Sequence, residues 1–166
     1  MYESFYGLKE KPFTLLPDPE YLYLSTMHQR ALTLLEYGMM NKAGFSVICG
    51  EMGVGKTTLI RHLLTKLDEN IVVGFIADAP QADENVLNSV ILSFGLDAEG
   101  KNVDDMLQLF ETYLIEQNAQ HKQVILIVDE AHNLVSEKLE ELRALTNITA
   151  NKDQLLQIIL VGQAGL

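Results

Sequence analysis

Four short apolar runs, separated by helical patterns, constrain the fold of this chain more than any other feature. The runs are rich in Val and Ile and cover residues 44–49, 71–77, 124–128 and 155–161. Because they are almost continuously apolar rather than alternating, both of their faces should be covered, as in a mostly parallel sheet flanked by helices. The pattern predicts a three-layer α/β fold.

Around these runs, apolar side chains recur every three or four residues, which is the spacing of an amphipathic helix. The segment of residues 86–94 has a predicted N-cap at Asp83 and a predicted stop at Gly95, where glycine accepts the left-handed backbone that ends many helices. The other predicted helices cover residues 27–41, 103–114 and 136–148, and one begins inside a glycine-rich loop and continues to Leu67.

The composition is that of a folded globular chain of one-domain size. Of its 166 residues, 48% are hydrophobic and 21% are charged, which excludes an intrinsically disordered chain. No apolar run approaches the roughly 18 residues of a membrane span, and the N-terminus lacks a signal-peptide pattern, so we expect a cytoplasmic protein with no membrane segment. The formal net charge of −11 repels a phosphate backbone, so direct nucleic-acid binding is not favoured.

Cys49 is the single cysteine of the chain. A lone cysteine forms neither an internal disulfide nor a metal cluster, which fits a reducing compartment. Because Cys49 ends the first apolar run, we expect it to be a small buried apolar residue.

The first 43 residues differ in character from the rest. They contain the aromatic and proline-rich stretch FYGLKEKPFTLLPDPEYLYLS, which is followed by a helical segment. A stretch this short and this rich in Phe, Tyr and Pro is expected to pack across a larger domain as an arm. We therefore divide the chain into an N-terminal arm and helix, residues 1–43, and a core domain, residues 44–166.

The stretch GEMGVGKTT matches the pattern G-x-x-x-x-G-K-[ST] and lies between an apolar run and a helical pattern, which is the context of a P-loop. Its glycines let backbone N–H groups approach phosphate oxygens, and the helix N-terminus adds a favourable dipole. Lys56 is placed to reach the β- and γ-phosphates of ATP, and the Thr57 hydroxyl to ligate Mg²⁺. The predicted nucleotide-binding residues are Gly50, Glu51, Met52, Gly53, Val54, Gly55, Lys56, Thr57 and Thr58.

The second motif is VILIVDEAHN, in which five apolar residues end in two adjacent carboxylates, the Walker B arrangement. Asp129 is predicted to hold Mg²⁺ together with Thr57, because hard cations favour carboxylate and water oxygens. Glu130 remains available to orient and deprotonate the water that attacks the γ-phosphate. Together the two motifs predict ATP hydrolysis and not only binding.

Gln163 follows the last apolar run, where a polar side chain is placed to contact the γ-phosphate or the attacking water. The alternative is a polar residue in an exposed turn. His132 lies close to Glu130 in the chain, but a solvated loop histidine explains it equally well, and we assign it no catalytic role. The predicted catalytic residues are Lys56, Glu130 and Gln163.

The order and spacing of these motifs resemble the AAA+ ATPases, and within them the ExeA- or GspA-like secretion ATPases, with related forms in pilus and exopolysaccharide gene systems. The matching segments are FYGLKEKPF, then PDPEYLYLS followed by His28, Ala31 and Leu35, then GEMGVGKTT, VILIVDEAHN and LLQIILVGQ. The resemblance implies ATP and Mg²⁺ as cofactors and a homo-oligomer or a partner ATPase. It also implies envelope secretion components as partners, and a position at the inner face of the membrane, reached through those partners or through a missing C-terminal region.

The resemblance further implies that one strand separates the P-loop strand from the strand of the second motif. Nucleotide would then lie at the carboxyl ends of the strands, as is general for open α/β sheets. The family also places the segment before the first strand near the adenine, which would give residues 28–37 a role in binding. Simple core packing explains that segment equally well.

The chain departs from the family pattern at its C-terminal side, because it stops at Leu166, just after the sensor strand. We expect it to lack the fifth strand and the helical lid. None of its arginines, Arg30, Arg61 and Arg143, matches the family's arginine finger, and a helical pair with Glu140 explains Arg143. Since such a finger is worth roughly 10³ to 10⁵ in rate, weak turnover is expected.

Three functions remain open at this point. The first is an AAA+ ATPase that drives assembly of an envelope secretion or surface-polymer export system. The second is a DNA-dependent ATPase of the transposition (TniB-like) type, which salt-dependent DNA binding would reveal. The third is a nucleotide-binding interaction module with little turnover.

Overall fold

The computed structural model describes residues 23–81, 84–150 and 153–164. Its main sheet has the strand order β1-β6-β3-β2, and every neighbouring pair is parallel. The strands are β1 (Phe45–Cys49), β2 (Ile71–Ile76), β3 (Gln123–Val128) and β6 (Leu156–Gly162). Because β6 lies between β1 and β3, the expected intervening strand is confirmed.

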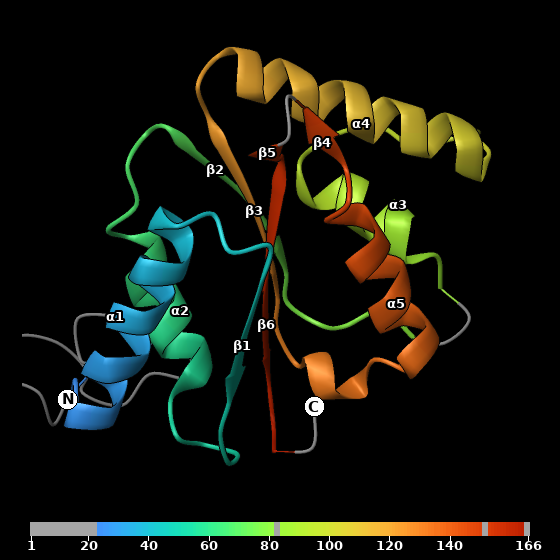
Figure 1. Ribbon diagram of the computed structural model, residues 1–166. Helices are drawn as coiled ribbons and strands as arrows, with labels where there is room; N and C mark the ends of the chain where they lie inside the picture. Colours follow the sequence, from blue (N-terminus) through green and yellow to red (C-terminus); the bar gives the residue numbers. More distant parts are fainter. Residues whose placement is uncertain (1–22, 82–83, 151–152, 165–166) are drawn as a thin grey trace, which may run out of the picture.

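Helices cover both faces of this sheet. Figure 1 shows α1 and α2 on one side and α3, α4 and α5 on the other. The helices are α1 (Thr26–Met40), α2 (Lys56–Leu64), α3 (Val86–Ser93), α4 (Val103–Ala119) and α5 (Ser136–Leu145). The predicted three-layer α/β fold with a parallel sheet is therefore confirmed.

The central strand β3 explains why its sequence is continuously apolar. Ile125 and Ile127 pack in one core cluster, with Leu32 of α1 and Ile60 of α2. Val124, Leu126 and Val128 pack in a second cluster, which is built mainly with α3, α4 and α5. Successive strand residues point to opposite faces, so a strand between two helical layers needs apolar side chains at every position.

The edge strand β1 behaves differently, and the expectation that Cys49 is buried is wrong. Cys49 is exposed, and Phe45 and Val47 on the same face of the strand are 36% and 52% exposed. The residues between them, Ser46 and Ile48, are half-buried on the side of α1, where Ile48 packs against the cluster that contains Leu32 and Leu35 and Ser46 lies close to Gly38. In the described part of the chain, β1 is the outermost strand beside β6, and none of its residues belongs to the core cluster built with α3, α4 and α5, so one face of β1 is left uncovered.

Two local features differ from the sequence expectations. Helix α3 is capped by Asn85, whose side chain accepts a hydrogen bond from the Asn88 N–H at 3.2 Å, and the expected cap Asp83 lies outside the described residues. Gly95 follows this helix with φ +73°, as a glycine stop requires. The predicted helix to residue 148 ends at Leu145, because a small hairpin of β4 (Thr149–Ala150) and β5 (Asp153–Gln154) follows.

The N-terminal helix α1 packs on the core through Leu32, Leu35 and Met39. The arm expected to precede it, residues 1–22, lies outside the described residues. None of the helices in the described ranges is both long enough and apolar enough to span a bilayer.

Candidate functional site

The predicted site residues meet at the carboxyl ends of three neighbouring strands. The glycine loop, residues 50–55, follows β1 and leads into α2. Asp129 and Glu130 follow β3, and Gln163 follows β6. Since β6 lies between β1 and β3, these segments converge at the edge of the sheet that is formed by the carboxyl ends of the strands, which we call the sheet edge.

Two glycines give the glycine loop its shape. Gly53 has φ +77° and Gly55 has φ +90°, a left-handed backbone that residues with a side chain rarely adopt. Gly55 is the N-cap of α2, so the loop ends where the helix presents its free N–H groups. Met52 is 81% exposed and Val54 is 44% exposed. The loop is therefore equipped to bind an anion through its backbone and not through these side chains.

Lys56, the first residue of α2, folds back over the glycine loop. Its Nζ donates hydrogen bonds to the carbonyl oxygens of Gly50 at 2.9 Å and Glu51 at 2.8 Å. An ammonium group has three donors, so these two bonds leave one for a further acceptor. The positive charge thus lies over the same loop whose backbone is open to an anion.

Thr57 and Asp129 are joined by a short hydrogen bond across the sheet edge. The Thr57 hydroxyl donates to Asp129 Oδ2 at 2.6 Å, and the Glu130 backbone N–H donates to Asp129 Oδ1 at 2.9 Å. Asp129 is 3% exposed, and both of its carboxylate oxygens are fixed in direction. A carboxylate beside a hydroxyl is a set of hard oxygen donors, which fits a water-rich Mg²⁺ site.

Glu130 has a strained backbone. Its φ of 51° and ψ of 32° are left-handed for a residue that has a side chain. Such strain costs on the order of 1–3 kcal/mol and is found at sites where the side chain must be aimed. The Glu130 side chain is 42% exposed, in contrast to its buried neighbour Asp129. One carboxylate is therefore fixed within the fold while the next is accessible.

His132 lies between Glu130 and Gln163, a position that the sequence analysis did not foresee. Its Nε2 is 3.1 Å from Gln163 Nε2, and its Nδ1 is 3.5 Å from Glu130 Oε2. If the Gln163 amide donates to Nε2, the neutral ring carries its proton on Nδ1, facing Glu130. The second distance is longer than a normal hydrogen bond, so this is a near contact. The only sequence signal was the two-residue spacing from Glu130.

A hollow of about 430 Å³ lies between α1 and the glycine loop. Its lining is mainly apolar and comes from α1, β1 and α2, with Ser25 and His28 as polar groups. We call it the α1 hollow. The apolar residues that line it are Met27, Ala31, Ile48, Cys49, Val54 and Leu59.

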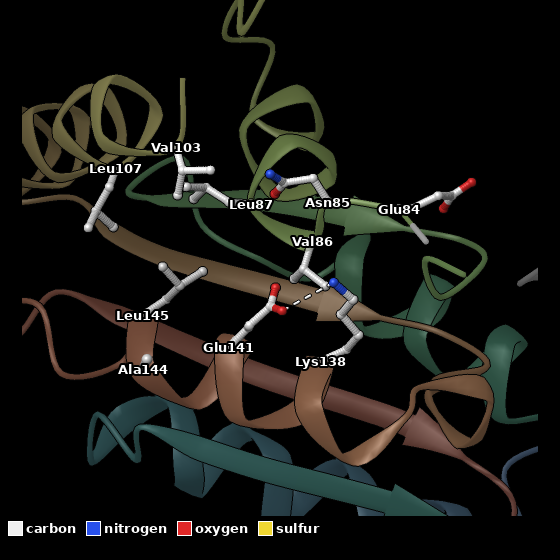
Figure 2. Close-up of a pocket in the computed structure, with 10 residues that line it drawn as sticks. All are labelled: Glu84, Asn85, Val86, Leu87, Val103, Leu107, Lys138, Glu141, Ala144 and Leu145. Atoms are coloured by element: carbon white, nitrogen blue, oxygen red, sulfur yellow. Dashed lines mark hydrogen bonds and ion pairs between the residues drawn. The ribbon is translucent and has the colours of Figure 1, made fainter. Parts of the chain in front are cut away.

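A larger hollow of about 530 Å³ lies on the other face of the sheet, between α3, the start of α4 and α5 (Figure 2). Apolar residues such as Val103 and Leu145 line it, together with an ion pair in which Lys138 Nζ is 3.1 Å from Glu141 Oε1. The glycine loop, Asp129 and Glu130 do not line this hollow. It therefore lacks the convergent phosphate-binding groups of the sheet edge.

On the α5 side, the predicted helical pair is confirmed. Arg143 Nη1 lies 3.1 Å from Glu140 Oε2, and both side chains are 70% exposed. Exposed pairs of this kind contribute about 0–1 kcal/mol.

Comparison with known proteins shows the family of this chain. An AAA domain model matches residues 39–166. The General secretion pathway protein A of Aeromonas hydrophila is 36% identical over 167 residues, which cover 100% of this chain and 30% of that protein. The chain thus spans less than a third of the length of this relative.

Solved structures show the same fold at low sequence identity. The ORC2 protein of Aeropyrum pernix, in its ADPNP-ADP complexes, matches with a TM-score of 0.60 and 16% identity, over 91% of this chain and 43% of that one. Cdc6p of Pyrobaculum aerophilum matches with a TM-score of 0.63 and 20% identity, over 92% and 41%.

Proposed function

This chain belongs to the AAA domain family, and from that premise we propose that it binds ATP with Mg²⁺ at the sheet edge and hydrolyses it slowly. The observation that carries the proposal is the convergence of three groups there. The glycine loop offers backbone N–H groups, Lys56 adds a positive charge over the loop, and Thr57 with Asp129 offers oxygen donors at 2.6 Å from each other.

In the proposed site, each group has one task. Backbone N–H groups of residues 50–58 surround the phosphates. Lys56 gives up its hydrogen bonds to the Gly50 and Glu51 carbonyls and donates to phosphate oxygens instead. Thr57 and Asp129 would hold Mg²⁺, partly through water. When bound, the ion neutralises charge on the phosphate oxygens.

Glu130 is the proposed general base. Its exposed carboxylate accepts a proton from the attacking water. Its strained backbone sets the direction in which the side chain leaves the main chain. Gln163 is the proposed sensor, and the His132 ring lies between it and Glu130, within 3.1 Å of Gln163 Nε2 and 3.5 Å of Glu130 Oε2. A change in the orientation of the Gln163 amide would then move the His132 imidazole, which lies beside the general base.

The α1 hollow is the proposed place for the adenine. It adjoins Gly50 and Lys56 of the phosphate site and has an apolar lining, which suits the faces of a purine. This assignment gives α1 a binding role through Met27 and Ala31 in addition to its packing role through Leu32 and Leu35.

The test is a calorimetric titration of Mg·ATP into the wild-type chain and into Lys56→Ala, repeated without Mg²⁺. Saturable binding that falls by roughly one to two orders of magnitude in the variant is expected, because a hydrogen bond to a charged group is worth about 1.5–3 kcal/mol. The free energy of unfolding of both chains is measured alongside. Absence of binding to the folded wild-type chain would overturn the proposal.

The proposed wider role is nucleotide-driven assembly, as a homo-oligomer or with a partner ATPase, of an envelope secretion or surface-polymer export system. The name of the Aeromonas relative supports it, as does the family. We propose a cytoplasmic location at the inner face of the membrane, held there by partners. Co-purification of envelope components with the tagged protein from membranes, lost on a high-salt wash, is the expected result.

Two alternatives stay in view. A DNA-dependent ATPase of the transposition type predicts DNA affinity that falls steeply with salt, against which the net charge of −11 argues. A nucleotide-binding interaction module predicts ATP binding with a turnover that does not change when Glu130 is replaced by glutamine.

A further inference from the structure

A hydrogen bond connects α1 to the glycine loop. His28 Nε2 lies 2.8 Å from the carbonyl oxygen of Val54, which is 26 residues further along the chain. The ring also lies against the next residue of the loop, since a Cβ placed on Gly55 would be 3.6 Å from His28 Nε2. The N-terminal helix therefore touches the loop at the residue just before the α2 N-cap.

Ser25 holds the histidine ring from its other side. Ser25 is the N-cap of α1 and accepts a hydrogen bond from the His28 backbone N–H at 3.3 Å, while its Oγ lies 2.8 Å from His28 Nδ1. A carbonyl oxygen only accepts, so Nε2 must carry the proton that is donated to Val54. In the neutral ring, Nδ1 then accepts from the Ser25 hydroxyl. Both ring nitrogens are thus engaged, and the ring orientation is fixed.

The bond to Val54 has a consequence for the N–H of Gly55. The peptide between these residues is planar and trans, so its C=O and N–H point in opposite directions. Holding the carbonyl toward α1 therefore turns the Gly55 N–H away from α1. Gly55 is one of the residues whose N–H groups would surround a phosphate. With φ at +90°, it has the backbone freedom that makes an external restraint useful.

We propose that His28 is a positioning residue for the phosphate-binding loop, which it holds through the Val54 carbonyl with Ser25 as its support. This inference rests on the proposed function, because it concerns the same phosphate site. It adds that the N-terminal helix prepares the loop for the phosphates, which is a task distinct from contact with the adenine. A ring that only stabilised the start of α1 would change unfolding but not nucleotide affinity.

The experiment compares Mg·ATP titration and thermal unfolding of the wild-type chain with His28→Ala, His28→Gln and the control Gln29→Ala. Gln29 is the exposed neighbour on α1, and its side chain bonds only weakly, at 3.4 Å, to the Leu24 carbonyl. We expect His28→Ala to bind Mg·ATP about threefold to tenfold more weakly, the effect of one hydrogen bond. His28→Gln keeps a donor within reach of Val54 and should recover most of that affinity.

A second measurement follows the loop without nucleotide. The amide resonance of Gly55 and its hydrogen exchange are recorded by NMR in the same variants. In His28→Ala, the Gly55 resonance should shift and its exchange should accelerate, while Gln29→Ala should match the wild type.

The outcomes separate the two claims. If the wild type binds Mg·ATP and His28→Ala binds it equally well, with Gly55 unchanged, the positioning role is wrong and the proposed function stands. If the wild type does not bind Mg·ATP, both the positioning role and the proposed function are wrong. If His28→Ala and Gln29→Ala lose the same affinity and the same thermal stability, the effect belongs to α1 as a whole and the positioning role is likewise overturned.

Discussion

The two ends of β3 and β6 both carry polar residues, and they use them differently. At the amino ends, Gln123 and Gln157 bond to each other, and the Gln123 side chain donates to the Met39 carbonyl at 2.9 Å. These groups are buried or half-buried and tie the end of α1 to the sheet. At the carboxyl ends, Glu130 is 42% exposed and Gln163 is half-buried. Here the polar groups face a space that a ligand can enter.

Polarity at the end of a strand therefore does not by itself mark a ligand-binding site. The amino-end amides use their donors and acceptors on the protein, so their replacement should affect folding. The carboxyl-end groups keep donors and acceptors for another molecule, so their replacement should affect binding or turnover. Substitutions at the two ends of the sheet test this division.

Replacing Glu130 with glutamine should slow ATP hydrolysis by about 10² to 10⁴, because a positioned general base contributes that factor, while affinity for Mg·ATP stays within about threefold. Phosphate release under single-turnover conditions measures the rate. Glu111→Gln makes the same chemical change at an exposed position of α4 and should leave the rate unchanged. Equal rates for Glu130→Gln and wild type would remove Glu130 from the chemistry.

Replacing Thr57 with alanine should remove most of the affinity that Mg²⁺ adds to ATP binding, roughly ten- to a hundredfold, because the hydroxyl that faces Asp129 is lost. Titrations with and without Mg²⁺ measure the difference. Thr57→Ser keeps the hydroxyl and should retain the Mg²⁺ effect. Thr65→Ala removes a hydroxyl that donates to the His62 carbonyl at 2.8 Å, away from Asp129, so it serves as the control. A full Mg²⁺ effect in Thr57→Ala would contradict the metal assignment.

At the opposite end of the sheet, Gln157→Ala should lower the free energy of unfolding by about 1–3 kcal/mol, because buried partners of a 4% exposed amide lose their hydrogen bonds. Urea denaturation measures this loss. Affinity for Mg·ATP should remain as in the wild type. If Gln157→Ala loses more Mg·ATP affinity than its smaller folded fraction accounts for, the two ends of the sheet do not have separate roles.

Two glycines offer a matched pair. Gly53 has φ +77° and Gly95 has φ +73°, and a Cβ on either meets nothing within 4 Å. Alanine at either position should therefore cost about 1–2 kcal/mol of stability from backbone strain alone. Only Gly53→Ala should also weaken Mg·ATP binding, because Gly53 lies in the glycine loop. If Gly53→Ala and Gly95→Ala bind Mg·ATP equally well, the left-handed conformation at Gly53 is not required for binding.

Much of the fold followed from local patterns. Within the described residues, the four strands of the main sheet and the five α-helices were predicted, because apolar runs and helical periodicity are properties of neighbouring residues, whereas the β4–β5 hairpin was not. The strand order came from the family resemblance and not from the pattern. The predicted burial of Cys49 was wrong because β1 is the outermost strand and the core built with α3, α4 and α5 does not include it, a tertiary arrangement that the apolar run does not encode.

The candidate site divides in the same way. The motifs located Lys56, Thr57 and Asp129, and the structure brings the last two within 2.6 Å of each other. The contacts of His28 with Val54 and of His132 with Gln163 span 26 and 31 residues, so no short motif contains them. The boundary between arm and core at residue 43, and the chemical roles of the site residues, remain predictions.

The exposed position of Cys49 gives the protein a built-in place for a reporter group. It is the single thiol of the chain, and it sits at the end of β1 immediately before Gly50. A maleimide fluorophore would therefore attach at one site without any engineered cysteine. Because Cys49 also lines the α1 hollow, the proposed place for the adenine, bound Mg·ATP should slow this labelling, and the labelling rate would report how far the hollow is occupied.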